Sequence, residues 1–162
     1  MQARERTPAE RWALGFGIFY LLLGLAGFAA TGLSGATLFK ADEGMRLLWI
    51  LSVNGFHNIA HVAFGAALVT AVSVAASTGR PEVARGAMVG LGSVELIAAL
   101  IGFTGAFVNF LNVPNGSAGL GANLFHLVTA VALMSVGFAP TDEPVGASPR
   151  PEQGRAVSSS AA

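Results

Sequence analysis

The sequence predicts an all-α membrane protein with four transmembrane helices, and three observations lead to that fold class. Of the 162 residues, 53% are hydrophobic and only 11% are charged, whereas an average soluble domain is about 25% charged. The mean hydropathy is +0.63. Four successive apolar windows are each about 20 residues long, enough to cross ~30 Å of hydrocarbon. A soluble globule of this size could not cover such a chain with polar surface.

Polar segments rich in turn-forming residues separate the four expected spans. The first loop is Ser34–Arg46, and the second contains Pro81, which stops a helix. The third contains Pro114 beside asparagine and glycine, which are common turn formers. The expected spans are Trp12–Leu33, Leu47–Val74, Ala87–Phe110 and Ala118–Phe138.

The segments outside the spans set the expected orientation. Seven arginines lie in the N-terminal segment 1–11, in the second loop and in the tail 139–162, whereas the first loop contains only Lys40 and Arg46 as basic residues. The positive-inside rule therefore places both termini in the cytoplasm and the transmembrane domain, 12–138, in the inner membrane. The tail is rich in Pro, Ser and acidic residues and is expected to be disordered.

Charge and residue types exclude several classes of function. The formal net charge is zero, which argues against a strongly basic nucleic-acid binder. The absence of cysteine removes disulfides, zinc–thiolate sites and thiol nucleophiles. No phosphate loop, dinucleotide fingerprint or Ser-His-Asp arrangement is recognisable. No catalytic residue is therefore assigned, and the sequence favours a protein that is not an enzyme.

The two halves of the chain resemble each other, which predicts two parallel helical-hairpin repeats. The segment Gly17–Phe28 aligns without a gap with Gly92–Phe103, and both end in Gly-Phe. Further on, the pattern Asn-x-Phe-His occurs at Asn54–His57 and again at Asn123–His126. Because each half would cross the membrane twice, the two repeats would run parallel.

The polar residues inside the spans collect on single helix faces. In the second span they recur at i, i+3, i+4 and i+7, and the fourth span repeats part of this pattern. Polar faces avoid lipid, so we expect them to point into the bundle. This polar cluster, which includes all three histidines of the chain, consists of Asn54, His57, Asn58, His61, Asn123 and His126.

Glu95 is the only acidic residue well inside an expected span. An ionised carboxylate in hydrocarbon costs roughly 2.5 kcal/mol or more, so Glu95 must be neutral or paired. One interpretation is a protonated acid that donates a hydrogen bond to a backbone carbonyl or to Tyr20. The other is a proton-handling role shared with His61, the histidine expected deepest in the bilayer.

Three functional hypotheses follow from these residues. In the first, the protein is a structural or accessory membrane subunit whose Asn/His cluster ties the helices together. In the second, His57, His61 and His126 bind a metal ion or a haem. In the third, Glu95 serves a proton-coupled small carrier. The expected partners are the lipid bilayer and further copies of the chain or a membrane complex, with no nucleic acid.

The second and fourth spans also carry a family resemblance. The run Asn54, His57, Asn58, His61 matches an Asn-x-x-His-Asn-x-x-His pattern, and Asn123 with His126 matches a later Asp-Asn-x-x-His motif whose acidic position is Ala122 here. On these motifs the chain resembles a bacterial, mainly actinobacterial, membrane family catalogued as domain of unknown function 4383. The resemblance covers roughly Ala13 to Phe138 and implies four helices around a shared polar centre, without implying an activity.

Overall fold

The computed structural model describes residues 4–33, 38, 46–47, 51–104 and 116–140. Its helices are α1 (Pro8–Thr31), α2 (Gly55–Thr78), α3 (Glu82–Thr104) and α5 (Gly116–Phe138). Each contains a stretch long and apolar enough to cross a membrane. The predicted fold class is therefore confirmed.

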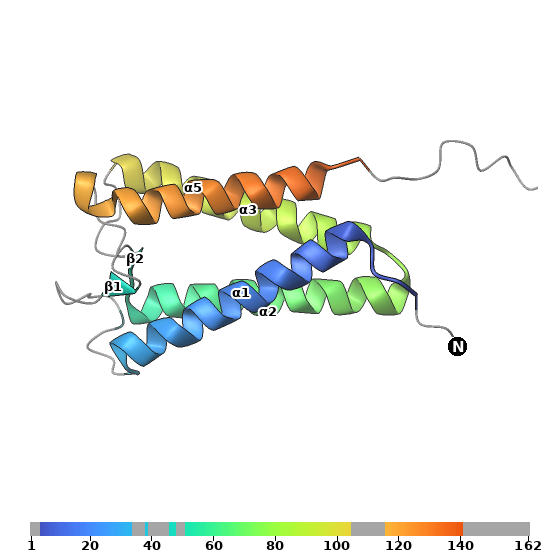
Figure 1. Cartoon of the computed structure of the whole chain (residues 1–162), viewed down its shortest axis with the longest axis horizontal. Coiled ribbons are helices and arrows are strands. Elements are labelled where there is room, and N and C mark those ends of the chain that lie inside the picture. The colour runs from blue at the N-terminus through green and yellow to red at the C-terminus, as the bar shows by residue number, and fades with distance from the viewer. Residues whose placement is uncertain (1–3, 34–37, 39–45, 48–50, 105–115, 141–162) are drawn as a thin grey trace, which may run out of the picture.

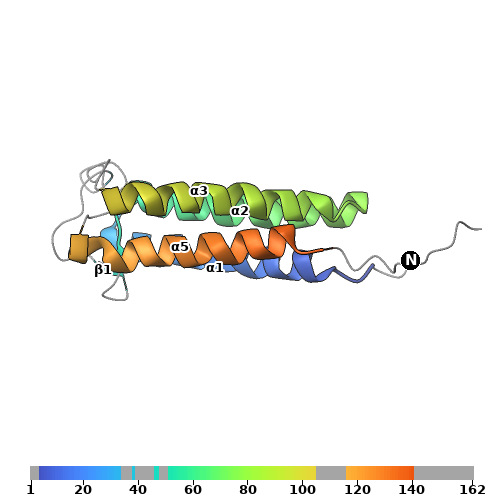
Figure 2. The same cartoon turned by 90° about the horizontal axis from the view of Figure 1, so that it is seen from above.

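The helices form a four-helix bundle made of two antiparallel pairs. In Figure 1, α1 lies along α2 and α3 lies along α5, and α1 begins at the end of the bundle where α5 finishes. Figure 2, seen from above, shows the same side-by-side packing. Contacts within each pair are far more extensive than contacts between the pairs. The bundle therefore consists of two closely packed helix pairs that contact each other less extensively.

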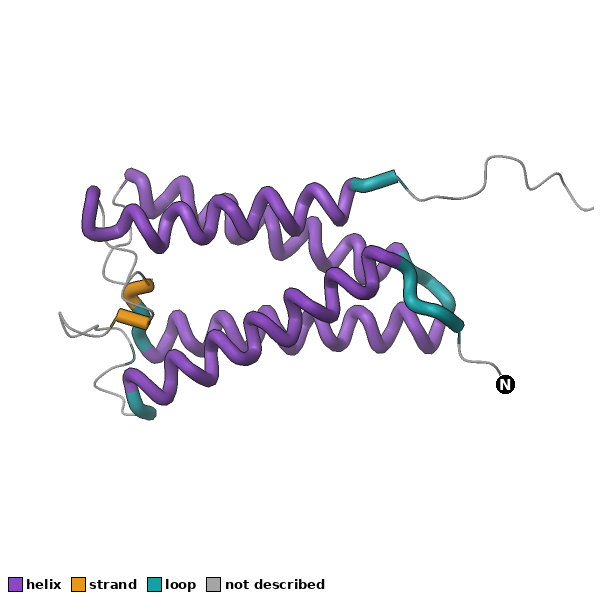
Figure 3. Tube along the Cα trace, in the orientation of Figure 1, coloured by secondary structure: helices purple, strands orange, loops and turns teal. Residues whose placement is uncertain are grey.

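The start of α2 differs from the expected span. The apolar run that begins at Leu47 is not helical throughout, because β1 (Arg46–Leu47) pairs antiparallel with β2 (Leu51–Ser52). Figure 3 shows this short strand pair beside the first turn of α2. The helix begins only after Asn54, whose side-chain oxygen accepts a hydrogen bond from the backbone N–H of His57 at 2.8 Å. An asparagine cap of this kind satisfies one of the free N–H groups of a first turn.

Other boundaries shift by smaller amounts. Two helices start before the apolar windows: α1 starts at Pro8, after the capping residue Thr7, and α3 starts at Glu82 and ends at Thr104. The Pro114 turn, most of the Ser34–Arg46 loop and nearly all of the expected disordered tail lie outside the described residues.

Replacing Asn54 with alanine should destabilise the start of α2. The substitution removes the N-cap hydrogen bond to the His57 N–H, and the loss of such a cap costs about 1 kcal/mol. We expect a matching drop in the free energy of unfolding, measured by titration with denaturing detergent. Asn54→Ser, which can still cap, is the control and should recover most of the loss.

Glycines bring the two helices of each pair into backbone contact. A Cβ built at Gly65 would lie 2.6 Å from the carbonyl oxygen of Gly17 on α1, and one built at Gly24 would lie 2.7 Å from that of Asn58 on α2. In the second pair, a Cβ at Gly92 would lie 3.1 Å from the carbonyl oxygen of Ala130. Small residues at such contacts allow close helix packing in membranes.

At the end of the bundle where α1 begins, arginines contact the last turns of neighbouring helices. Arg4 pairs with the buried Glu10 and donates to the carbonyl of Ala75 near the end of α2. Arg85 donates to the carbonyl of Gly137 at 3.1 Å, near the end of α5. Both contacts place positive charge at the negative end of a helix dipole, and the contact of Arg85 also satisfies a carbonyl of the last turn of α5.

Candidate functional site

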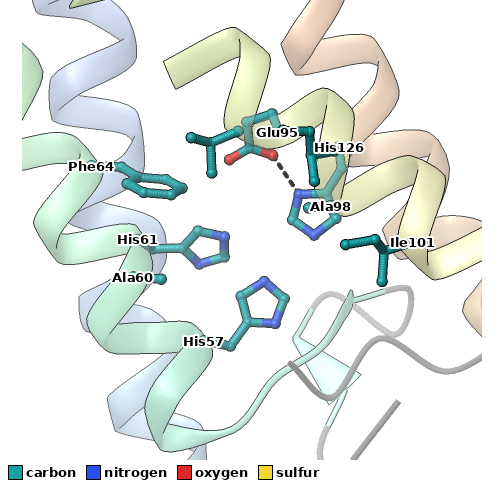
Figure 4. A pocket seen from close by; sticks show the side chains of 10 residues that line it. His57, Ala60, His61, Phe64, Glu95, Ala98, Ile101 and His126 are labelled. Carbon is teal, nitrogen blue, oxygen red and sulfur yellow. Dashed lines mark hydrogen bonds and ion pairs between the residues drawn. The ribbon is translucent and has the colours of Figure 1, made fainter. Parts of the chain in front are cut away.

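Three histidines and Glu95 surround a cavity of about 160 Å³ between the two helix pairs. His57 and His61 extend from α2, Glu95 from α3 and His126 from α5, as Figure 4 shows. The cavity therefore draws its polar groups from both pairs of helices.

The central interaction of the site joins Glu95 to His126. The Oε2 atom of Glu95 is hydrogen-bonded to the Nδ1 atom of His126, and the two residues are only 1% and 5% exposed. Glu95 lies beyond the midpoint of α3, level with His126 on α5. The packing of α3 on α5 thus brings His126 to Glu95, a pairing that the sequence analysis did not name.

The histidine rings are close to one another and to Tyr20. The ring centroids of His57 and His61 are 4.5 Å apart, as expected for i and i+4 on one helix, and His57 stacks on His126 at 5.5 Å across the pair boundary. The Tyr20 ring of α1 lies 5.7 Å from His61. Its hydroxyl is also within electrostatic range of Glu95. All four helices therefore contribute to this centre.

Several buried polar atoms of the centre face the cavity region without a hydrogen-bond partner in the described part of the chain. They include both ring nitrogens of His61, which is 2% exposed, together with the Nε2 atom of His126 and the Oε1 atom of Glu95. Leaving a buried polar atom unpaired costs about 1–3 kcal/mol. Such a concentration in one place indicates a functional site, because ordinary cores satisfy nearly all their polar atoms.

The asparagines of the predicted polar cluster have separate surroundings. Asn54 caps α2, and the Asn58 amide donates to the hydroxyl of Thr31 on α1 at 2.9 Å. Asn123 is buried, and neither amide atom has a hydrogen-bond partner among the described residues. The six residues of the predicted polar cluster thus form two groups. The three histidines line the cavity, whereas the three asparagines do not.

Sequence reasoning missed two residues of this region. Thr31, the partner of Asn58, is near the end of its helix and carries no pattern of its own. Phe64 also lines the cavity; it lies seven residues after His57 on the same helical face, and that spacing could have identified it.

The metal hypothesis receives no geometric support. Among the residues that the structure describes, no three His, Cys, Asp or Glu side chains are arranged to hold a metal ion. The rings of His57, His61 and His126 lie near one another, but their nitrogens do not converge as a ligand set.

Comparison with known proteins places the chain in a family. Neither the search of curated proteins nor the search of solved structures found a match. The family model described as domain of unknown function (DUF4383) matches residues 10–139, which include all four helices almost entirely. The chain therefore belongs to the DUF4383 family, as the asparagine and histidine motifs predict.

Proposed function

We propose that this protein is a proton-binding membrane protein in which the Glu95–His126 pair takes up and releases a proton inside the bilayer. The observation that carries the proposal is the hydrogen bond between these two side chains, both almost completely buried within membrane-spanning helices. Ionisable residues inside a membrane are costly, and they commonly mark ion pathways and proton relays.

The chemistry of the pair is simple. With no added proton, an ionised Glu95 accepts from the Nδ1–H of a neutral His126, and the pair carries one negative charge. One added proton makes the pair neutral overall, whether the proton is held by the carboxylate or by the ring. When the ring holds the added proton, both of its nitrogens are donors; when Oε2 of Glu95 holds the proton and donates it to Nδ1, the ring's own hydrogen is on Nε2. In both of these arrangements the Nε2 atom of His126 changes from an acceptor to a donor. Proton uptake is thereby converted into a change of hydrogen bonding at the cavity.

A structural role alone accounts less well for the site. The Asn58–Thr31 bond joins α1 to α2, and the Glu95–His126 bond joins α3 to α5, so each lies within one helix pair. The two ring nitrogens of His61, although buried, have no hydrogen-bond partner among the described residues. A cluster that served only to hold helices together would be expected to use these atoms in hydrogen bonds.

The arginines at one end of the bundle support an orientation with both termini in the cytoplasm, which is part of this proposal. Arg4, Arg6, Arg11, Arg80 and Arg85 all lie at the end where α1 begins. A concentration of arginine next to spans favours the cytoplasmic side of an inner membrane. The centre would then lie toward the outer half of the bilayer, because Glu95 lies beyond the midpoint of α3.

The test is a pH titration of the carboxyl groups by infrared difference spectroscopy on the full chain in lipid. We expect a buried carboxyl signal that changes with pH and disappears in Glu95→Gln. In His126→Ala the same carboxyl should stay protonated over a wider pH range, since nothing then stabilises its charge in hydrocarbon.

The matched control is Glu82→Gln, because Glu82 is solvent-exposed at the start of α3 and pairs with Arg80. This variant should leave the buried carboxyl signal unchanged. A Glu95 carboxyl that keeps one protonation state from acidic to alkaline pH would overturn the proposal.

A further inference from the structure

The cavity beside the Glu95–His126 pair opens toward the surface that faces lipid. Its rim on α3 includes Val94 and Ile97, which are 47% and 56% exposed. The other apolar residues of the wall are Ala60, Ala98, Ile101 and Phe64. A molecule could therefore enter sideways from the bilayer, between α2 and α3, without crossing water.

The inner end of the cavity offers hydrogen bonds. His61 is 2% exposed, and neither of its ring nitrogens has a partner among the described residues. A neutral imidazole always carries one N–H donor. The Nε2 atom of His126, also without a partner there, becomes a second donor when the pair binds a proton. The site is thus suited to a ligand with hydrogen-bond acceptors.

The size and shape of the cavity limit the kinds of ligand that fit it. A cavity of about 160 Å³ is close to the roughly 150 Å³ of an engineered cavity that binds benzene. The rings of Phe64, His57 and His61 line it, so a flat ring would find aromatic surfaces for stacking. One six-membered ring fits, and any longer apolar chain would extend past Val94 and Ile97 into lipid.

The charge of the residues around the cavity favours a ligand whose head group is neutral over one whose head group is anionic. The titratable groups around the cavity are His57 and His61 from α2, Glu95 from α3, His126 from α5 and, behind His61, Tyr20 from α1. The protonated pair is neutral overall, and the unprotonated pair is negative. A fatty-acid carboxylate would therefore add negative charge beside Glu95 in a medium of low dielectric, at a high cost.

We infer that the cavity binds the ring of a membrane quinone, with a ring carbonyl accepting a hydrogen bond from His61 and, after proton uptake, from His126. The inference rests on the proposed function in one respect: protonation of the Glu95–His126 pair supplies the second donor. Quinone binding should consequently tighten as pH falls and the pair takes up its proton.

The test is isothermal titration calorimetry of the full chain in mild detergent with decylubiquinone, a benzoquinone with a ten-carbon tail. We expect saturable binding of one quinone per chain. Ala98→Phe, which fills the cavity from α3, should weaken binding at least tenfold. Ala67→Phe is the matched control, because Ala67 is exposed on α2 and does not line the cavity, and it should bind as the wild type does.

A second measurement tests whether the variant Ala98→Phe is still correctly folded. The infrared titration of Glu95 should be retained in Ala98→Phe, which shows that the centre is intact while the quinone is excluded. The milder Ala98→Leu should give an intermediate affinity.

The remaining outcomes separate the two proposals. Failure of decylubiquinone to saturate wild-type protein, or equal binding by Ala98→Phe, would overturn the quinone site while a titrating Glu95 left the proton proposal standing. The quinone site would also be overturned if palmitate competed with decylubiquinone and bound with higher affinity. Quinone binding to a chain whose Glu95 never titrates would refute the proton proposal instead.

Discussion

Replacing His126 with alanine is expected to lower the free energy of unfolding by about 3 kcal/mol at neutral pH, because it leaves Glu95 buried without its partner. The cost should shrink as pH falls, since a protonated carboxyl is far less costly to bury than an ionised one. Reversible unfolding in mixed micelles, with increasing fractions of denaturing detergent at several pH values, measures both effects.

The control is the double variant Glu95→Leu/His126→Leu, which replaces both partners with apolar side chains of comparable size. Because no charge then stays unpaired, the double variant should be more stable than His126→Ala and should lose the pH dependence. The pair would be shown to contribute nothing to the fold if the losses of stability in Glu95→Leu and in His126→Leu simply added up to the loss in the double variant.

Gly65→Ala should be the most damaging of the glycine-to-alanine changes on α2. The added Cβ would lie 2.6 Å from the carbonyl oxygen of Gly17 and 2.6 Å from the backbone nitrogen of Leu21, so α1 would have to move away from α2. Overpacking of this kind typically costs about 1–3 kcal/mol. The same unfolding titration provides the measurement.

The matched control is Gly90→Ala on α3, where an added Cβ meets nothing within 4 Å. Alanine is the better helix former by about 1 kcal/mol, so this variant should be as stable as the wild type or slightly more stable. Equal effects of Gly65→Ala and Gly90→Ala would contradict the close approach of α1 and α2.

The periodicity of the second span correctly places His57 and His61 on one buried face, because residues four apart on a helix share a side. The same reasoning groups Asn54 and Asn58 with them, although one caps the helix and the other bonds Thr31. A helical stripe more than one residue wide can face two neighbours at once, and the spacing alone does not tell which residue faces which helix.

Capping chemistry explains the largest difference between an expected span and the helix observed there. The run from Leu47 to Val53 is apolar enough to extend the second span, but Asn54 accepts the hydrogen bond that starts the helix at Gly55. Hydropathy measures the cost of leaving water and says little about where a first turn begins.

Composition and apolar length by themselves determined that this chain forms four membrane-spanning helices, since only helices satisfy every backbone group within a single segment in lipid. The presence of one acidic residue deep in a span likewise required Glu95 to be either neutral or paired. Only the tertiary structure decided that the partner is His126 and that a cavity lies beside the pair. The physical reason is that the register and rotation of one helix against another depend on contacts such as Gly65 against Gly17, which join residues far apart in the sequence.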